Sequence, residues 1–228
     1  MYALADQKII RRSWIQNANI PKARQGWTIA DCKLGDPEIL NGFNRWLIGA
    51  KNGKIILASG QENCGRGILL CGEPGRGKTA MAAACLQDIM LTFPLEAFVP
   101  SPGKVLIRPC YFSTFNEFIA LKGKTMDGSD DDEKMLYEGM LGEAPDDAYN
   151  IRVLVIDDLG KEHTTLSGWQ RNLLHDILRT RFNNGLPTIV TTNIPLEDWE
   201  ADYGNATASF AKEAFVYFPI STKNNDLR

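Results

Sequence analysis

The octapeptide at residues 72–79 constrains the fold more than any other feature of the sequence. It reads GEPGRGKT and fits the pattern G-x-x-x-x-G-K-[ST]. The apolar run Ile68–Cys71 precedes it, and a helical pattern over Thr79–Leu91 follows it. A strand, this turn and a helix in that order indicate the phosphate-binding loop of a P-loop NTPase. A glycine-rich turn that binds nothing is the alternative, and the full match in this context argues against it.

Each residue type in this loop has a chemical reason. Glycines let backbone N–H groups approach phosphate oxygens, and the helix N-terminus adds a partial positive charge. The Lys78 ammonium can reach the outer phosphates, and the Thr79 hydroxyl can bind magnesium. The sequence therefore predicts ATP and Mg²⁺ as cofactors. The expected nucleotide-binding residues are Gly72, Glu73, Pro74, Gly75, Arg76, Gly77, Lys78, Thr79 and Ala80.

A second signal is a pair of aspartates after the apolar run Val153–Ile156. Such a run predicts a central parallel strand, and ligands of open α/β sheets bind at the carboxyl ends of the strands. We expect Asp157 to bind the metal with Thr79, and Asp158 to orient or deprotonate the attacking water. Paired aspartates can also simply cap a turn. Hydrolytic enzymes of this class commonly have a glutamate at the second position, and Asp158 is one methylene shorter.

A third signal is Thr191-Thr192-Asn193 at the end of another apolar run. The Asn193 amide can touch the γ-phosphate or hold the attacking water. By itself the tripeptide favours a plain strand-to-turn transition, because Asn before Ile194-Pro195 is a good turn residue. The predicted catalytic residues are thus Asp158, Asn193 and Lys78.

Strand and helix patterns alternate five times along the chain, which predicts an α/β fold. With the phosphate loop, we expect a P-loop NTPase core with a five-stranded, mostly parallel sheet between helices. The expected strands are 68–71, 110–112, 153–156, 188–191 and 215–218, and the expected helices are 37–52, 79–91, 115–119, 167–185 and 207–215.

The length of 228 residues suggests one domain with additions. Residues 1–35 look irregular and form a short basic segment, with a local charge of +4 over 1–24. Residues 36–228 would form the ATPase domain. Within it, 123–150 looks like an exposed acidic insertion, partly disordered, with a local charge of −8 over 126–147.

Composition excludes several classes of protein. With 44% apolar and 23% charged residues the chain is neither disordered nor fibrous. It has no apolar run near the roughly 20 residues that span a bilayer, and no signal peptide is visible, so we expect a cytoplasmic protein. The five cysteines are scattered without a CxxC pair, which predicts free thiols rather than a zinc site.

Three blocks together resemble the DnaC/DnaI/IstB group of AAA+ ATPases. They read GRGILLCGEPGRGKT, VLVIDDLGKE and RFNNGLPTIVTTN, and their order and spacing match over roughly residues 64–200. The resemblance implies ATP binding between subunits that self-associate head to tail, and binding of single-stranded DNA. In the loader branch of the group it also implies delivery of a DnaB-like hexameric replicative helicase onto that DNA.

Two departures from the group affect this expectation. Loaders usually carry a separate helicase-binding domain before the core, and only about twenty residues precede it here, too few for a folded domain. Related proteins also have two arginines, four residues apart, in the last helix, where Ala206 and Phe210 stand in this sequence. An absent arginine finger predicts slow hydrolysis. Lys212, Arg179 and Arg181 are nearby candidates to replace it.

Several alternatives remain open from the sequence. An IstB-like transposition accessory ATPase, a small-molecule kinase and a weakly hydrolysing nucleotide-gated scaffold would share the phosphate loop. For DNA contact, Phe115 and Phe118 with Lys122 and Lys124 can form a stacking and charge platform. Aromatic residues at helical spacing more often belong to the core, and that interpretation is favoured.

Overall fold

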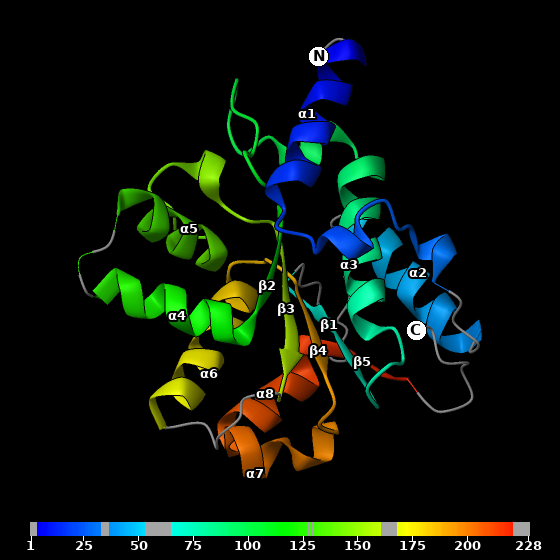
Figure 1. The fold of residues 1–228 in the computed structure, drawn as a ribbon, viewed down its shortest axis with the longest axis vertical. Coiled ribbons are helices and arrows are strands. Elements are labelled where there is room, and N and C mark those ends of the chain that lie inside the picture. Colours follow the sequence, from blue (N-terminus) through cyan, green and yellow to red (C-terminus); the bar gives the residue numbers. More distant parts are fainter. Residues whose placement is uncertain are drawn as a thin grey trace.

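A five-stranded sheet forms the centre of the protein in this computed structural model (Figure 1). The structure describes residues 4–32, 37–52, 65–126, 128, 130–160 and 168–220. The strands are β1 Gly67–Gly72, β2 Cys110–Thr114, β3 Val153–Leu159, β4 Thr188–Thr192 and β5 Phe215–Ile220. The helices are α1 Leu4–Asn17, α2 Pro37–Asn52, α3 Lys78–Thr92, α4 Phe115–Met126, α5 Asp131–Leu141, α6 Gly168–Asn183, α7 Trp199–Tyr203 and α8 Asn205–Ala214. Short 3₁₀ turns lie at Lys22–Arg24, Ile29–Asp31, Leu95–Phe98, Asp147–Tyr149 and Leu196–Asp198.

The strand order is β2-β3-β4-β1-β5, and every neighbouring pair is parallel. Each crossover passes through a helix, as parallel pairing requires. The prediction of an α/β fold with a five-stranded parallel sheet is therefore confirmed. All five expected strands exist, each extending by one to three residues beyond its expected run.

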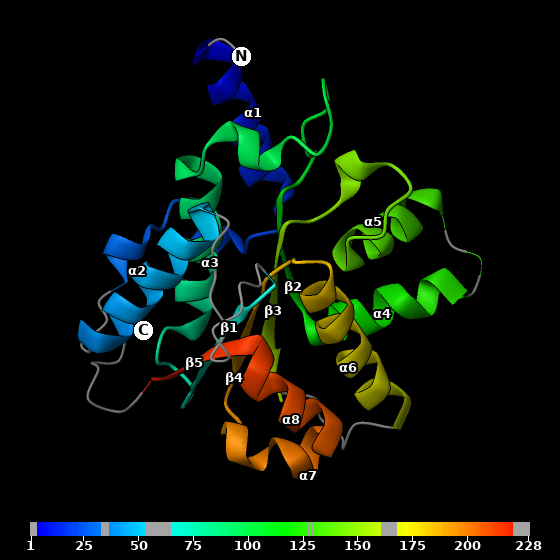
Figure 2. The ribbon, with the colours of Figure 1, turned by 180° about the vertical axis from the view of Figure 1, so that it is seen from behind.

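Alternating side chains of the strands feed two separate cores, one on each face of the sheet. On β3, Val153 and Val155 belong to the cluster with α1, α2 and α3, whereas Leu154 and Ile156 belong to the cluster with α4 to α8. Figures 1 and 2 show these two groups of helices on opposite faces. The period of two along a strand produces this division.

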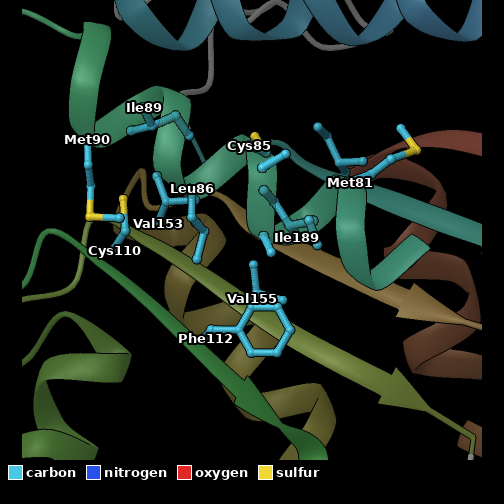
Figure 3. Packing of buried hydrophobic residues seen from close by; sticks show 14 of the residues in the cluster. Met81, Cys85, Leu86, Ile89, Met90, Cys110, Phe112, Val153, Val155 and Ile189 are labelled. Carbon is cyan, nitrogen blue, oxygen red and sulfur yellow. The ribbon is translucent and has the colours of Figure 1, made fainter. Parts of the chain in front are cut away.

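Helix α3 supplies much of the first core (Figure 3). Its Met81, Cys85, Leu86, Ile89 and Met90 lie over strand residues that include Cys110, Phe112, Val153, Val155 and Ile189. Almost the whole length of α3 is buried, including Ala82, Ala83 and Ala84. Because α3 begins directly at the phosphate loop, this packing fixes the loop against the sheet.

The expectation that residues 1–35 are irregular is wrong for Leu4–Asn17, which form α1. Trp14 is 1% exposed and donates its indole N–H to the Leu106 carbonyl at 2.7 Å. Arg11 donates to the Met90 and Phe93 carbonyls at the end of α3. The polar residues of this segment give no local sign of a buried helix, whereas Trp14 holds α1 at Leu106 and Arg11 holds it at the end of α3.

The segment after α1 is also bound to α3, through Gln87. This side chain is 2% exposed and donates from Nε2 to the Arg24 and Trp27 carbonyls at 2.9 and 3.0 Å. Its Oε1 accepts the Gly26 N–H at 2.6 Å. The middle of α3 therefore holds the backbone of residues 24–27 in place.

The expected exposed insertion at 123–150 is instead largely ordered and packed. Helix α4 continues to Met126, and α5 covers Asp131–Leu141 with the Asp130 carboxylate as its N-cap. Acidic residues fill its first turn, where the helix dipole favours them. Tyr137 and Met140 on its other face are buried in the second core. Part of the charge run is thus the N-terminal turn of a helix whose Tyr137 and Met140 pack in the core.

Helix α7, the cysteines and the test for membrane-spanning helices complete the comparison with expectation. Helix α7 has no counterpart in the predicted elements, although its Trp199 is completely buried. Ser167, the first residue of the expected helix 167–185, lies outside the described residues, as does Cys64. The other four cysteines are free and buried, and burial raises the pKa of the Cys32 thiol to about 11. Within the described ranges, no helix is long and apolar enough to cross a membrane.

Candidate nucleotide-binding site

The loop of residues 72–79 connects β1 to α3 at the carboxyl edge of the sheet. Gly75 and Gly77 have φ angles of 84° and 79°, a region that favours glycine. Gly77 is the N-cap of α3, so the chain turns from the strand into the helix at this residue. A Cβ at Gly72 would lie 2.3 Å from the Ile220 carbonyl oxygen of β5, which leaves no space for a side chain there. The three glycines of the motif are thus required by the backbone path.

Two charged side chains of the loop form an ion pair with each other. Glu73 and Arg76 form an ion pair with 2.8 Å between Oε2 and Nη2. Glu73 and Pro74 are exposed, and Arg76 is half-buried. This ion pair joins the second and fifth residues of the loop.

Lys78 is nearly buried, and its ammonium points back across the loop. Nζ donates to the Gly72 and Glu73 carbonyls at 2.7 and 2.9 Å, and to Asn193 Oδ1 at 2.7 Å. The third contact joins the first residue of α3 to the residue after β4. Three oxygen acceptors therefore hold the Lys78 ammonium group in place within the site.

Thr79 and Asp157 meet on the α3 side of the sheet. The Thr79 hydroxyl donates to Asp157 Oδ2 at 3.1 Å, and Asp157 is 4% exposed. Hydroxyl and carboxylate oxygens are the hard donors that Mg²⁺ prefers, and Mg²⁺ usually takes its other ligands from phosphate and water. The residues present therefore fit a magnesium ion. The described residues contain no group of three or more His, Cys, Asp or Glu side chains placed to hold a metal without such help.

Asp158 lies one residue further along, at an irregularity of β3. Its φ is 59°, and the pairing of β3 with β4 shifts between Ile156 and Leu159. The side chain is only half-buried, unlike that of Asp157. The structure thus brings together the predicted residues Lys78, Thr79, Asp157 and Asn193 by direct contacts, with Asp158 adjoining Asp157 in the chain.

The sequence pattern did not identify Thr191 as a residue of the candidate site. The Thr191 hydroxyl donates to Asp157 Oδ1 at 2.6 Å and accepts the Asp158 N–H at 2.9 Å. The sequence placed Thr191 at the end of a strand, but only the pairing of β3 with β4 shows that it faces the two aspartates. A hydroxyl at the end of a strand next to an acidic strand end is the one signal that could have suggested it.

The three candidate replacements for an arginine finger occupy different environments. Arg181 is completely buried and donates to main-chain carbonyls, which excludes it. The Arg179 guanidinium lies over the Phe210 ring at 4.7 Å, and Lys212 is exposed on α8. Phe210 itself packs against Phe182 in the second core. Position 210 therefore faces the core in this chain.

The proposed stacking platform on α4 does not exist. Phe115 and Phe118 are each 1% exposed and belong to the second core, as the favoured interpretation predicted. Lys122 lies over the Tyr137 ring at 4.5 Å, and Lys124 forms an ion pair with Glu133. These groups join α4 to α5.

The sequence is similar to one family model and to one curated protein. The family model described as IstB-like ATP binding protein matches residues 133–212. A RuvB-like helicase 1 from Gibberella zeae is 33% identical over 100 residues, which are 42% of this chain and 20% of that protein. This chain therefore matches only about a fifth of the length of that curated relative.

Solved structures match over a larger part of the chain. The crystal structure of the DnaC helicase loader has a TM-score of 0.58 and 25% identity, covering 88% of this chain and 100% of that one. DnaI has a TM-score of 0.58 and 18% identity, covering 89% and 95%. AMPPCP-bound DnaA from Aquifex aeolicus has a TM-score of 0.55 and 14% identity, covering 90% and 53%. The last two likenesses concern the fold alone.

The parallel sheet and the loop that joins β1 to α3 define a P-loop protein with the fold of AAA+ ATPases. The family match runs from within α5 to within α8 and does not include the phosphate loop. The assignment of that loop rests on its sequence motif and its geometry. Residues 133–212 are similar to the IstB-like ATP-binding family, and the DnaC helicase loader and DnaI are among the structural neighbours of the chain. The resemblance that the three sequence blocks indicated is confirmed.

Proposed function

We propose that this protein binds and hydrolyses ATP with Mg²⁺ and uses that cycle to load a hexameric, DnaB-like replicative helicase onto single-stranded DNA. The observation that carries the ATP site is the meeting of Lys78, Asn193, Thr79 and Asp157 beside the α3 N-terminus. The start of α3, the end of β3 and the residue after β4 contribute these side chains at the carboxyl edge of the sheet, where ligands of such folds bind.

Each residue has a role set by its chemistry. The loop N–H groups and the Lys78 ammonium would bind the phosphates, and Thr79 with Asp157 would hold the magnesium ion. When bound, that ion would neutralise charge on the phosphate oxygens. Asp158 would orient or deprotonate the attacking water, and Asn193 would contact the γ-phosphate or that water. To bind ATP, Lys78 Nζ would exchange its contacts with the Gly72 and Glu73 carbonyls for phosphate oxygens. Release of the nucleotide would reverse that exchange.

The loader assignment rests on the DnaC likeness, which extends over the whole of that solved chain at 25% identity. Binding of single-stranded DNA is part of the same proposal, and a structure of DnaA bound to AMPPCP and single-stranded DNA has a TM-score of 0.57 to this chain. That likeness, at 14% identity, concerns the fold alone. Head-to-tail self-association with ATP between subunits belongs to the same proposal.

The second candidate is an IstB-like accessory ATPase of transposition, which the matching family model favours. The two candidates differ in partner rather than in chemistry. An experiment with purified protein, ATP, single-stranded DNA and either a DnaB-like helicase or a transposase separates them. Helicase retained on circular single-stranded DNA only when this protein and ATP are present supports loading. Retention of the transposase alone supports the second candidate.

Lys78→Ala tests the ATP site that both candidates require. Removing the ammonium takes away the charge that would contact the outer phosphates, so we expect nucleotide affinity to fall by at least about 100-fold. Titration with a fluorescent ATP analogue measures this, and circular dichroism with thermal melting checks that the fold remains. An unchanged affinity in the folded variant would disprove the proposed site. Turnover measured with and without DNA then separates an ATPase from a nucleotide-gated scaffold.

A further inference from the structure

The extra residue in β3 is the starting point for an inference about Thr191. Ile156 pairs with Val190, and Leu159 pairs with Thr192. Between these two pairs β3 advances by three residues and β4 by two, so Asp157 and Asp158 together face the single residue Thr191. This is a β-bulge, a device that changes the direction in which a side chain points.

The bulge determines where the second carboxylate lies. Along β3, residues 154 and 156 face the second core, so regular alternation would direct residue 158 into the same apolar region. Leu159 occupies that core instead, because the extra residue reverses the phase of the strand. Asp158 is therefore left half-buried at the strand end. An unpaired carboxylate in the core would be strongly unfavourable.

Thr191 contacts both sides of the bulge with one hydroxyl group. It is 0% exposed, and its single proton goes to Asp157 Oδ1 at 2.6 Å. Its oxygen accepts the N–H of Asp158 at 2.9 Å, the residue with the positive φ. Left-handed backbone is unfavourable for a residue with a side chain and persists where the surroundings hold it. The other oxygen of Asp157 accepts from Thr79, so the carboxylate is held from both directions.

We propose that Thr191 is a positioning residue for the reaction, and this inference rests on the proposed ATPase function. It fixes the Asp157 carboxylate toward Thr79 and holds the Asp158 backbone in the bulge, which keeps the second carboxylate at the strand end. Thr191 itself touches no reacting atom. Partners of this kind that orient a metal ligand typically change metal affinity or activity by about 10- to 100-fold when removed.

Thr191→Val tests this inference, because valine keeps the shape and removes both hydrogen bonds. We expect turnover to fall and the Mg²⁺ concentration for half-maximal nucleotide binding to rise, each by about tenfold or more, with nucleotide affinity in EDTA unchanged. Thr191→Ser retains the hydroxyl and should restore both to within about threefold of the original protein. The matched control is Thr188→Val, a buried threonine of the same strand whose hydroxyl accepts from Arg181 Nε instead. It should lower the melting temperature and leave the Mg²⁺ dependence unchanged.

Several outcomes would overturn the inference. Thr191→Val with the turnover and Mg²⁺ dependence of the unchanged protein would do so, as would equal losses in the Ser and Val variants. If the unchanged protein neither binds nor hydrolyses ATP, the proposed function fails, and a crystal structure of Thr191→Val still decides the inference. It stands if the bulge is lost or the Asp157 carboxylate turns away from Thr79. It fails if Asp158 keeps its positive φ and Asp157 its contact with Thr79.

Discussion

At the scale of the residue, the two adjacent aspartates have different surroundings and therefore different expected roles. Asp157 is buried and held by Thr79 and Thr191, as a group that holds a metal ion should be. Asp158 is half-buried at the strand end, where water can reach it. The same side chain type can thus serve as a fixed ligand at one position and as a base at the next.

Replacing Asp158 with asparagine separates these roles. Asn has nearly the same shape and cannot take up a proton, so we expect nucleotide affinity to change by less than about threefold and turnover to fall by about 10²- to 10⁴-fold. Fluorescent nucleotide titration and phosphate release measure the two quantities. Normal turnover in this variant would show that another group, or water alone, acts as the base.

Arg181 illustrates a charged residue whose role is in the core. It is 0% exposed, and burial lowers the pKa of its guanidinium. It donates from Nη1 to the carbonyls of Met140 and Ile151, and from Nη2 to those of Arg152 and Pro187. It therefore joins the end of α5 to the starts of β3 and β4. Its hydrogen bonds offset the unfavourable burial of the charge.

Arg181→Met should consequently destabilise the fold without a specific effect on the site. Several buried carbonyls would lose their donor, each contributing about 1–3 kcal/mol, so we expect the free energy of unfolding to fall by about 3 kcal/mol or more. Urea denaturation measures it. Arg179→Met on the same helix is the control, because Arg179 is exposed and should cost about 1 kcal/mol or less. Equal effects of the two variants would contradict the assigned role.

At the scale of the element, α3 joins the phosphate loop to the N-terminal segment. The helix begins at the loop with Lys78, and Gln87 in its middle holds residues 24–27. Its last turn receives Arg11 from α1. Helix α3 therefore connects the phosphate loop physically to both parts of the N-terminal segment.

Gln87→Leu tests the anchor in the middle of α3. The three main-chain groups it contacts at residues 24, 26 and 27 would lose their partner, so this segment should open more often. We expect trypsin to cleave after Lys22 and Arg24 at least about tenfold faster, as read by mass spectrometry of the first fragments. Leu91→Ala, at an exposed residue of the same helix, should cleave like the original protein. Unchanged cleavage in Gln87→Leu would show that other contacts hold the segment.

At the scale of the whole molecule, the composition of α8 bears on the rate of the proposed reaction. Phe210 occupies a core position where related proteins are expected to have an arginine, and Ala206 is exposed but uncharged. Helix α8 contains no arginine, so assembly through this helix would bring no arginine to the nucleotide of a neighbour. A missing arginine finger reduces phosphoryl-transfer rates by about 10³- to 10⁵-fold.

The purified protein alone should therefore hydrolyse ATP slowly, on the order of 10⁻³ per second, and should self-associate only weakly on adding ATP. Phosphate release and size-exclusion chromatography with light scattering measure these properties. Addition of single-stranded DNA and the partner protein is the comparison that shows whether turnover is stimulated. Rapid turnover of the isolated protein, above about 1 per second, would be incompatible with this account.

Most of the fold and the main site residues were predictable, because their signals are local. The phosphate loop, the five strands and the positions of Asp157 and Asn193 follow from short patterns of residue type that a strand, turn or helix imposes on its own segment. Helices α1 and α5 were misinterpreted for the opposite reason. Their charges are visible in the sequence, but Trp14 and Tyr137 are buried only because distant elements cover them.

Sequence alone thus determined the type of fold, the loop that would hold the phosphates and the acidic strand end beside it. Only the tertiary structure decided which buried groups meet: Thr191 with both aspartates, Lys78 with Asn193, and Gln87 with the N-terminal segment. The physical reason is that a hydrogen bond between strands depends on register and bulges. These are set by packing of the whole sheet against its helices and leave no trace in the local pattern of either strand.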